Sequence, residues 1–309
     1  MKKISLITPV LNEEETLDTF FKEVYAFTNK HSNIYEFEFI FTDNCSTDKT
    51  FKKLLNYYKK DPRIKIFRLS KNFGYQRSIW TGYSQATGDA CIQLDADLQD
   101  PLSIVSIFLK EWEDGKKIVY GIRKNRKEAF LIKNVRKCFY RVLNKLSKDT
   151  LPADAGDFML IDKSIVQLLR EEYDPRIYIR GRVHSYGFKK KGVPYSRNER
   201  LHGESKFNLG RNFSLALDAI VNHSFVPLRI AILIGFLFFI FSILFSSCYL
   251  VAKIFFKTSW PAGFATTTIL LLVGIGLNGL FVGAIGEYIL RIHSILKKPK
   301  MSIIEEKTT

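Results

Sequence analysis

Asp95, Ala96 and Asp97 follow an apolar run, Cys91–Leu94, that is typical of a buried strand. Two carboxylates that stand two positions apart on a turn can point at one hard cation and at a ribose or phosphate. Mg²⁺ and Mn²⁺ prefer such oxygen ligands and usually bring phosphates into their coordination shell. Acidic turns of this kind are common in proteins, so the triplet by itself is only a weak indication of a metal site.

Other polar segments strengthen this indication. Residues 9–13, 43–48 and 71–74 each follow a strand-like run, and Gln99-Asp100-Pro101 comes directly after the acidic triplet. In open parallel sheets, ligands bind at the carboxyl ends of the strands. The loops together therefore predict a site for a phosphate-containing ligand at one edge of a sheet.

The elements that position these loops alternate along the chain up to about residue 122. Short apolar runs predict strands at Ile4–Thr8, Phe37–Thr42, Ile64–Leu69, Ala90–Leu94 and Ile118–Ile122, and helix-like segments lie at 13–30, 47–59, 75–86 and 101–114. Strands that alternate with helices predict an α/β domain whose mainly parallel sheet is covered on both faces.

The last third of the chain has a different composition. Residues 230–252 contain no charged side chain, and as a helix they would extend roughly 35 Å, which is enough to cross a bilayer core. A second uncharged run covers residues 258–286. Two buried core helices are the alternative, which the length of the runs disfavours. Basic residues beyond both outer ends predict a membrane hairpin with these ends in the cytosol.

The sequence thus predicts a cytosolic catalytic domain (1–205), a juxtamembrane amphipathic helix (206–226), a two-helix transmembrane hairpin (227–290) and a cytosolic tail (291–309). The amphipathic segment would lie in the membrane interface or pack against a core, and its pattern fits both. Four scattered cysteines lack disulfide or metal spacing, and no signal peptide precedes the first strand. We expect a multi-pass protein of the inner (plasma) membrane with its catalytic domain in the cytosol.

The net charge of +16 is concentrated in two segments. Residues 116–148 hold a single acid, Glu128, among many Lys and Arg, and a second basic stretch spans 189–211. No common nucleic-acid-binding module is present, so we expect anionic lipid and a phosphate-bearing substrate as partners. Solvated or lipid-facing charges are the alternative. The candidates for binding phosphate are Arg123, Arg126, Lys133, Arg136, Arg200, Ser205 and Lys206.

The ordered motifs resemble the family-2 glycosyltransferases, which have the GT-A fold. The segments that carry the resemblance are Thr8–Glu14, Asp43–Asp48, Lys71–Gly74, Gln93–Pro101, Asp154–Phe158, Arg180–Arg182 and Gly203–Lys206. Within this family the chain is similar to the polyprenyl-phosphate group, which includes dolichol-phosphate mannose synthases and bactoprenol glucosyltransferases. The last three segments, followed by two apolar runs, are closer to the bactoprenol glucosyltransferases. The resemblance covers nearly the whole chain.

The resemblance implies a GT-A (Rossmann-like) domain, a divalent cation (Mg²⁺ or Mn²⁺) and a role for each matching residue. It assigns donor binding to Pro9, Asn12, Glu13, Asp43, Lys71 and Asp95. Asp97, together with Asp95, would bind the metal, and Asp157 stands at the position proposed for a catalytic base. Many relatives have Asp and Gly where this chain has Asn44 and Cys45, so Asn44 is left out of the metal shell.

The chemistry follows from the charges that form. A nucleotide-sugar loses a diphosphate, whose growing negative charge a divalent ion and Arg or Lys stabilise. A lipid phosphate has a second pKa of about 6 and is already a nucleophile at neutral pH. Positioning then matters more than a strong base, and Asp157 could instead orient the sugar or the acceptor.

These expectations combine into one prediction: inverting transfer of one hexose, glucose from UDP-glucose, to undecaprenyl phosphate at the cytosolic membrane face. GDP-mannose-dependent mannosyl transfer, a processive polysaccharide synthase and a non-catalytic nucleotide-sugar-binding scaffold stay open as alternatives. The synthase is disfavoured because the chain lacks a Gln/Arg-x-x-Arg-Trp signature and has only two predicted spans. Glycines in the second span permit close helix contacts, and we expect a homo-oligomer.

Overall fold

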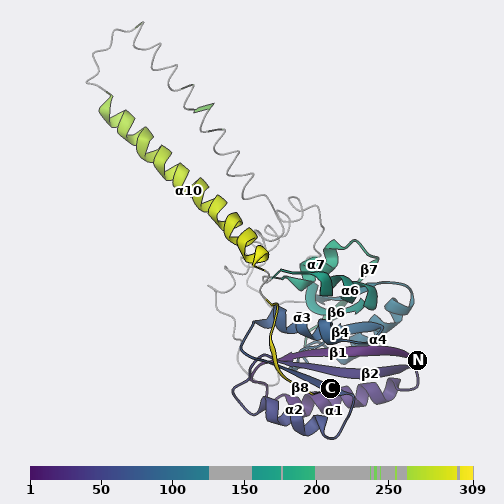
Figure 1. Ribbon diagram of the computed structural model, residues 1–309. Helices are drawn as coiled ribbons and strands as arrows, with labels where there is room; N and C mark the ends of the chain where they lie inside the picture. Colours follow the sequence, from purple (N-terminus) through teal and green to yellow (C-terminus); the bar gives the residue numbers. More distant parts are fainter. Residues whose placement is uncertain are drawn as a thin grey trace. The chain divides into compact units, whose positions relative to one another are not determined.

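The computed structural model describes residues 1–124, 155–174, 177–198, 263–297 and 300–308, together with positions 237, 240, 241, 244 and 255. The chain forms two compact units, one of Met1–Lys206 with Lys298–Thr309 and the other of Phe207–Lys297. The first unit contains the sheet that positions the polar loops (Figure 1).

The described part of the first unit is built on one eight-stranded sheet with the strand order β7-β5-β6-β4-β1-β2-β3-β8. Its strands are β1 (Lys2–Val10), β2 (Tyr35–Asp43), β3 (Ile64–Leu69), β4 (Ala90–Gln93), β5 (Ile118–Lys124), β6 (Ala155–Asp162), β7 (Lys190–Ser196) and β8 (Ile304–Thr308). The central strands β4, β1, β2 and β3 are parallel, as predicted, and β5 and β7 are also parallel. Strands β6 and β8 pair antiparallel with their neighbours, so the sheet is mixed.

Helices cover both faces of this sheet (Figure 1). They are α1 (Leu17–His31), α2 (Thr50–Tyr58), α3 (Tyr75–Gln85), α4 (Leu102–Glu113), α6 (Lys163–Glu171) and α7 (Ile179–Ser185). Helices α1, α2 and α4 pack on one face, while α3, α6 and α7 pack on the other. Neighbouring strand residues point to opposite faces, so that Leu6 joins the first core and Ile7 the second. Burial on both faces explains why the central strands are apolar throughout.

The five strands and four helices predicted up to residue 122 are all present. Strand β3 has the predicted bounds, but α1 and α2 begin about one turn later than expected. Residues ahead of each helix are instead part of the polar loops; for example, the N–H of Thr16 donates to the carbonyl of Glu13 in a turn.

Two glycines determine how α3 lies on the sheet. Gly74, just before the helix, has a φ of +88°, a left-handed conformation that glycine adopts readily. At Gly82, an added Cβ would lie 2.3 Å from Cγ2 of Ile7, so the helix packs directly on β1. Helix α3 therefore begins at a fixed point, and its first turn carries Tyr75 and Gln76 toward the polar loops.

Strand β8 lies in the segment that the sequence predicts as a tail. It pairs antiparallel with β3, and the N–H of Ser70 donates to the carbonyl of Ile303 at 3.0 Å. Thr81 of α3 donates its hydroxyl to Oγ of Ser302 at 2.7 Å. This late segment therefore covers the edge of the sheet beside the loop that follows β3.

The second unit contains helix α10 (Phe264–Leu296), which overlaps the second predicted span. No helix in the described residues has both the length and the apolar character required to cross a membrane. The predicted hairpin is therefore not confirmed. The predicted amphipathic helix, residues 206–226, and nearly all of the first span, residues 230–252, lie outside the described residues.

Candidate active site

The loops after β1 and β2 hold each other in place. Oδ1 of Asn12 accepts a hydrogen bond from the N–H of Thr47 at 2.8 Å, and the N–H of Asn12 donates to Oγ of Ser46 at 3.0 Å. The N–H of Glu13 donates to Oγ1 of Thr50 at 2.8 Å. Pro9, also predicted to bind the donor, is buried in β1. Asn12 was predicted to bind the donor. In the structure it also holds the loop after β2 in place.

Asn44 joins the loop after β2 to the loop after β3. Its Nδ2 donates to Oδ1 of Asn72 at 2.8 Å, and its Oδ1 accepts from the N–H of Phe73 at 2.9 Å. The side chain thus joins the two loops. Lys71, predicted to bind the donor, is exposed, and its Nζ lies 5.2 Å from the centre of the Phe73 ring.

The backbone of these loops is strained. In the described chain, the non-glycine residues with positive φ are Asn12 (55°), Cys45 (64°) and Leu98 (48°). They lie in the loops after β1, β2 and β4 respectively. Such conformations cost free energy and cluster at functional sites, so their position at the carboxyl edge of the sheet supports a site there.

Asp43, at the end of β2, is fully buried. Its Oδ1 accepts from the N–H of Ser46 at 3.0 Å, whereas Oδ2 has no hydrogen-bond partner in the described chain. Nε of Arg68 lies 3.7 Å from Oδ2 and also has no hydrogen-bond partner there. Burial raises the pKa of Asp43. An unsatisfied buried acceptor next to an unsatisfied donor is costly without a ligand, so the pair is suited to binding a polar group.

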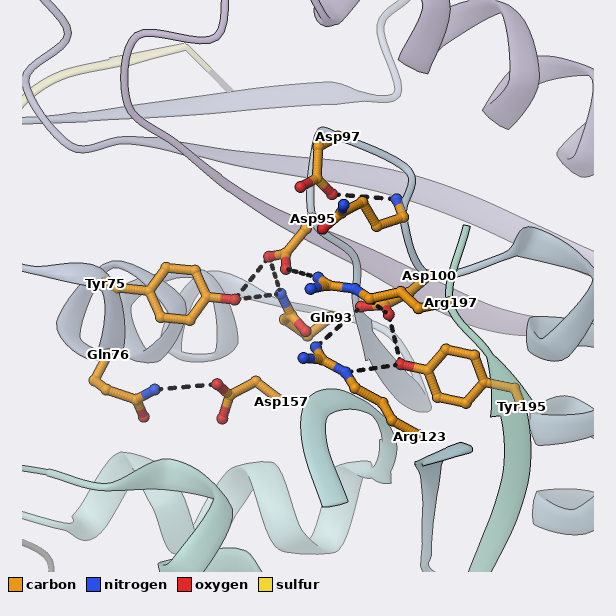
Figure 2. Close-up of polar contacts among 11 residues, drawn as sticks. Tyr75, Gln76, Gln93, Asp95, Asp97, Asp100, Arg123, Asp157, Tyr195 and Arg197 are labelled. Atoms are coloured by element: carbon orange, nitrogen blue, oxygen red, sulfur yellow. Dashed lines mark hydrogen bonds and ion pairs between the residues drawn. The ribbon is translucent and has the colours of Figure 1, made fainter. Parts of the chain in front are cut away.

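Asp95 is held by two hydrogen bonds and lies beside one guanidinium group (Figure 2). Its Oδ1 accepts from the hydroxyl of Tyr75 at 2.7 Å and from Nε2 of Gln93 at 2.8 Å. A guanidinium nitrogen of Arg197 lies 3.7 Å from its Oδ2. Burial raises the pKa of Asp95 to about 6, and the nearby carboxylates add to this rise while the Tyr75 hydrogen bond opposes it. A positive charge beside Asp95 would therefore be stabilised.

Asp97 lies on the same loop and accepts from the N–H of Gln99 at 3.2 Å (Figure 2). The described residues contain no group of three or more His, Cys, Asp or Glu side chains that could hold a metal ion. Mg²⁺, however, is usually bound by one or two carboxylates together with substrate phosphates. Asp95 and Asp97 supply such oxygen ligands, so the loop fits a divalent cation whose coordination shell a bound diphosphate completes.

Asp100 anchors two arginines beside this loop (Figure 2). Its side chain is 3% exposed and accepts from the hydroxyl of Tyr195 and, at 3.2 Å, from Nε of Arg197. Arg123 lies 3.7 Å from its other oxygen and donates to the Tyr195 hydroxyl at 3.3 Å. Burial lowers the pKa of Arg123, but Asp100, Tyr195 and Asp95 together outweigh it and the net shift is upward. Both guanidinium groups are thus held at the site by Asp100.

Asp157, the predicted catalytic carboxylate, lies on β6. Its Oδ2 accepts from Nε2 of Gln76 at 3.4 Å, and its Oδ1 has no hydrogen-bond partner among the described residues. An added Cβ at the preceding residue, Gly156, would lie 3.3 Å from a guanidinium nitrogen of Arg123. The glycine therefore leaves room for Arg123 close to Asp157. The structure brings Asp95, Asp97, Asp157 and Arg123 into one region (Figure 2).

Other predicted phosphate-binding residues lie outside the described residues: Arg126, Lys133, Arg136, Arg200, Ser205 and Lys206. The structure adds residues that the sequence analysis did not assign to the site, namely Tyr75, Gln76, Gln93, Asp100, Tyr195 and Arg197. Asp100 stood next to the acidic triplet, and Arg197 belongs to the second basic stretch. Gln93 is the first residue of the motif Gln93–Pro101, whereas Tyr75 and Gln76 lie outside all of the motifs, and Tyr195 lies in a strand that was not predicted.

Comparison with known proteins gives a consistent result. The family model for glycosyl transferase family 2 matches residues 5–169. An uncharacterized glycosyltransferase of Bacillus subtilis is 33% identical over 98% of this chain and 93% of its own length. The prophage bactoprenol glucosyl transferase homolog of Escherichia coli is 31% identical over 98% of both chains. The bactoprenol glucosyl transferase of Shigella phage SfV is 32% identical over 99% of both chains.

A solved mannosyltransferase from Pyrobaculum calidifontis, in complex with GDP-Man and Mn²⁺, superposes with a TM-score of 0.47 at 15% identity. The match covers 66% of this chain and 58% of that one, and it is too weak to carry an argument. The family model matches more than half of the chain, and the relatives match nearly all of it. This chain belongs to glycosyltransferase family 2.

Proposed function

We propose that this protein transfers a single glucose from UDP-glucose to a polyprenyl phosphate, with inversion at the anomeric carbon. One observation carries the proposal: three carboxylates, Asp95, Asp97 and Asp157, lie at one sheet edge with the guanidinium groups of Arg123 and Arg197 (Figure 2). A donor that carries a diphosphate and an acceptor that carries a phosphate match the cations, while the carboxylates match a divalent cation and sugar hydroxyls.

The unsatisfied atoms at Asp43 and Arg68 support a nucleotide donor. Oδ2 of Asp43 requires a hydrogen-bond donor, and Nε of Arg68, 3.7 Å away, requires an acceptor. The imide edge of uracil offers an N–H beside a C=O, which complements this pair. Guanine, cytosine and adenine also present an N–H beside an acceptor atom, so the pair supports a nucleobase at this position and does not by itself select uracil.

The reaction is a direct displacement. An oxygen of the acceptor phosphate attacks C1 of the hexose, a new C1–O bond forms, and the C1–O bond to UDP breaks with its electron pair leaving on UDP. Attack from the face opposite the leaving group inverts the configuration. Arg123 and Arg197 face the charge that grows on the phosphates. A bound divalent cation at Asp95 and Asp97 would neutralise part of that charge.

Asp157 has an orienting role in this proposal. The acceptor phosphate has a second pKa of about 6 and needs little help to lose a proton at neutral pH. Oδ1 of Asp157 has no hydrogen-bond partner in the described chain, while Gln76 holds Oδ2. The free oxygen can accept from a sugar hydroxyl or from a protonated acceptor, which fixes the reacting groups in line.

The relatives and the sequence support this choice of acceptor. Two relatives that match nearly the whole chain are called bactoprenol glucosyl transferases or homologs of them. The basic residues 116–148 and the uncharged run 230–252 suit a phosphate on a lipid at a membrane surface. We place the reaction at the cytosolic face of the inner membrane.

A transfer assay tests this function. Membranes that contain the full-length chain are incubated with undecaprenyl phosphate, Mg²⁺ or Mn²⁺, and one labelled donor at a time: UDP-glucose, UDP-galactose, UDP-N-acetylglucosamine or GDP-mannose. The proposal predicts a labelled, organic-extractable lipid with UDP-glucose. If labelled lipid forms only with GDP-mannose, the transferred sugar is mannose and not glucose. An absence of labelled lipid with every donor would contradict polyprenyl-phosphate transfer and favour a non-catalytic scaffold.

A further inference from the structure

We propose that Arg197 is the counter-ion of Asp95 in the donor-free enzyme. Its positive charge opposes the binding of a divalent cation until the negative charge of the donor diphosphate offsets it. This inference rests on the proposed function, because it assigns the diphosphate of a nucleotide-sugar to this site. It makes Arg197 a positioning residue that couples the binding of metal to the binding of donor.

Arg197 has a firm attachment away from the acidic triplet. Its Nε lies 3.2 Å from Oδ1 of Asp100, whose side chain is only 3% exposed. The backbone is tied as well, because the N–H of Asn198 donates to the carbonyl of Gln99 at 2.9 Å. Tyr195, two residues earlier, also donates to Asp100. The guanidinium group is therefore held beside the triplet whether or not it contacts Asp95.

The contact of Arg197 with Asp95 is looser. The guanidinium nitrogen lies 3.7 Å from Oδ2 of Asp95, which is an ion pair at a distance too long for a good hydrogen bond. By contrast, Oδ1 of Asp95 is held at 2.7 Å by Tyr75 and at 2.8 Å by Gln93. Breaking the Arg197 contact therefore leaves the position of Asp95 unchanged (Figure 2).

These charges couple the binding of the metal to the binding of the donor. A divalent cation on Asp95 and Asp97 would stand close to the positive charge of Arg197, and like charges at such distances repel strongly inside a protein. A diphosphate adds negative charge next to both cations and turns this repulsion into shared attraction. Metal and nucleotide should consequently bind with positive coupling, and each should raise the affinity for the other by the same factor.

Mn²⁺ binding to the purified full-length chain in detergent tests the inference without turnover. Free Mn²⁺ is measured by electron paramagnetic resonance, with and without UDP. In Arg197→Gln we expect Mn²⁺ to bind about tenfold more tightly than in wild type when UDP is absent, because one repelling charge is gone. The factor by which UDP improves Mn²⁺ binding should fall about tenfold, since UDP also loses a partner.

Two variants control for general effects. Arg197→Lys keeps the positive charge and should retain weak Mn²⁺ binding in the absence of UDP. Arg63→Gln changes the net charge by the same amount, but Arg63 pairs with Asp61 just before β3, at the opposite edge of the sheet from the triplet. It should behave as wild type, and thermal unfolding of each variant checks that it is folded.

The outcomes separate this inference from the proposed function. Unchanged or weaker Mn²⁺ binding in folded Arg197→Gln, with normal coupling to UDP, would overturn the counter-ion role and leave the donor site intact. If Arg63→Gln binds Mn²⁺ as tightly as Arg197→Gln does, the counter-ion role is also overturned, because the effect then comes from net charge alone. Wild type that binds no UDP under any condition would instead contradict the proposed donor.

Discussion

Gln76 connects Asp157 to helix α7. Its Nε2 lies 3.4 Å from Oδ2 of Asp157, and its Oε1 accepts from the N–H of Ile179, the first residue of α7, at 3.0 Å. Gln76 itself lies in the first turn of α3, just after the loop that joins β3 to this helix. A single amide thus fixes one oxygen of Asp157, while the other oxygen is buried and has no hydrogen-bond partner among the described residues (Figure 2).

Replacing Gln76 by Ala should therefore disturb the orientation of Asp157 more than the binding of the donor. We expect kcat to fall about tenfold while KM for UDP-glucose changes little, because small losses of alignment slow the chemical step. Steady-state transfer kinetics measure this. Gln85→Ala, at the other end of the same helix, serves as the control and should keep the wild-type kcat. A rise in KM with unchanged kcat would contradict the positioning role of Gln76.

Asp97 should be essential for transfer. Asp97→Asn keeps the size of the side chain and removes the charge that a divalent cation requires, so we expect at least about 100-fold lower kcat with Mg²⁺ or Mn²⁺. Asp61→Asn, which alters a carboxylate paired with Arg63 far from the triplet, should retain activity. Wild-type activity in Asp97→Asn, or equal activity of wild type with and without chelator, would show that the triplet binds no essential metal.

Glu38 should make stability depend on pH. The side chain is 2% exposed and accepts hydrogen bonds from Ser5, Lys65 and Thr87, and Lys3 lies 3.0 Å away. Burial favours the neutral acid, but these partners outweigh it and lower the pKa from 4.5 to about 2. The folded state thus binds fewer protons than the unfolded state between these values, and the stability that Glu38 contributes is lost as pH falls through this range.

Glu38→Gln should accordingly lower the free energy of unfolding by about 2 kcal/mol at pH 7, because buried partners lose their ion pair. The difference from wild type should shrink below pH 4.5 and nearly vanish near pH 2. Urea unfolding of the full chain in detergent at several pH values measures it. Glu36→Gln, exposed on the same strand, is the control. A difference that is independent of pH would contradict the shifted pKa.

Gly82 should tolerate no side chain. An added Cβ would meet Cγ2 of Ile7 at 2.3 Å, so we expect Gly82→Ala to destabilise the fold by about 1–3 kcal/mol. Ile7→Ala removes the clashing group at the expense of a cavity. The double variant should then be more stable than the sum of the two single changes predicts, which a double-mutant cycle of unfolding free energies measures. Strict additivity would show that the two residues do not press on each other.

The sequence predicted the parts of the fold in which local pattern and burial agree. The apolar runs at Ile4–Thr8 and Ile64–Leu69 form central strands because both of their faces are covered. Strand β6 lies beyond residue 122, where no strand was predicted, and it was missed. Strands β7 and β8 were missed too, and their residues, KKGVPYS and IEEKT, are mostly polar or charged. They are strands because β5 and β3 offer an open edge, which is a tertiary effect that no short window of sequence contains.

The site, too, could be predicted from the sequence only in part. Asp95, Asp97 and Asp157 could be identified from motifs, and the order of the strands brings them to one edge. Tyr75 and Arg197 could not be, because their roles depend on contacts with Asp95 across 20 and about 100 positions of sequence. Asp100 needed the structure too, since a carboxylate beside the triplet could have been a third metal ligand instead of the anchor of two arginines.

The lipid product made by purified protein tests the central claim most directly. The full-length chain is incubated with ¹³C-labelled UDP-glucose, undecaprenyl phosphate and Mn²⁺, and the lipid fraction is analysed by mass spectrometry and NMR. Our account predicts one hexose on each lipid phosphate, β-linked, and none with Asp97→Asn. An α-linked product, a chain of several hexoses, or release of free glucose without any glycolipid would contradict inverting transfer of a single sugar to a polyprenyl phosphate.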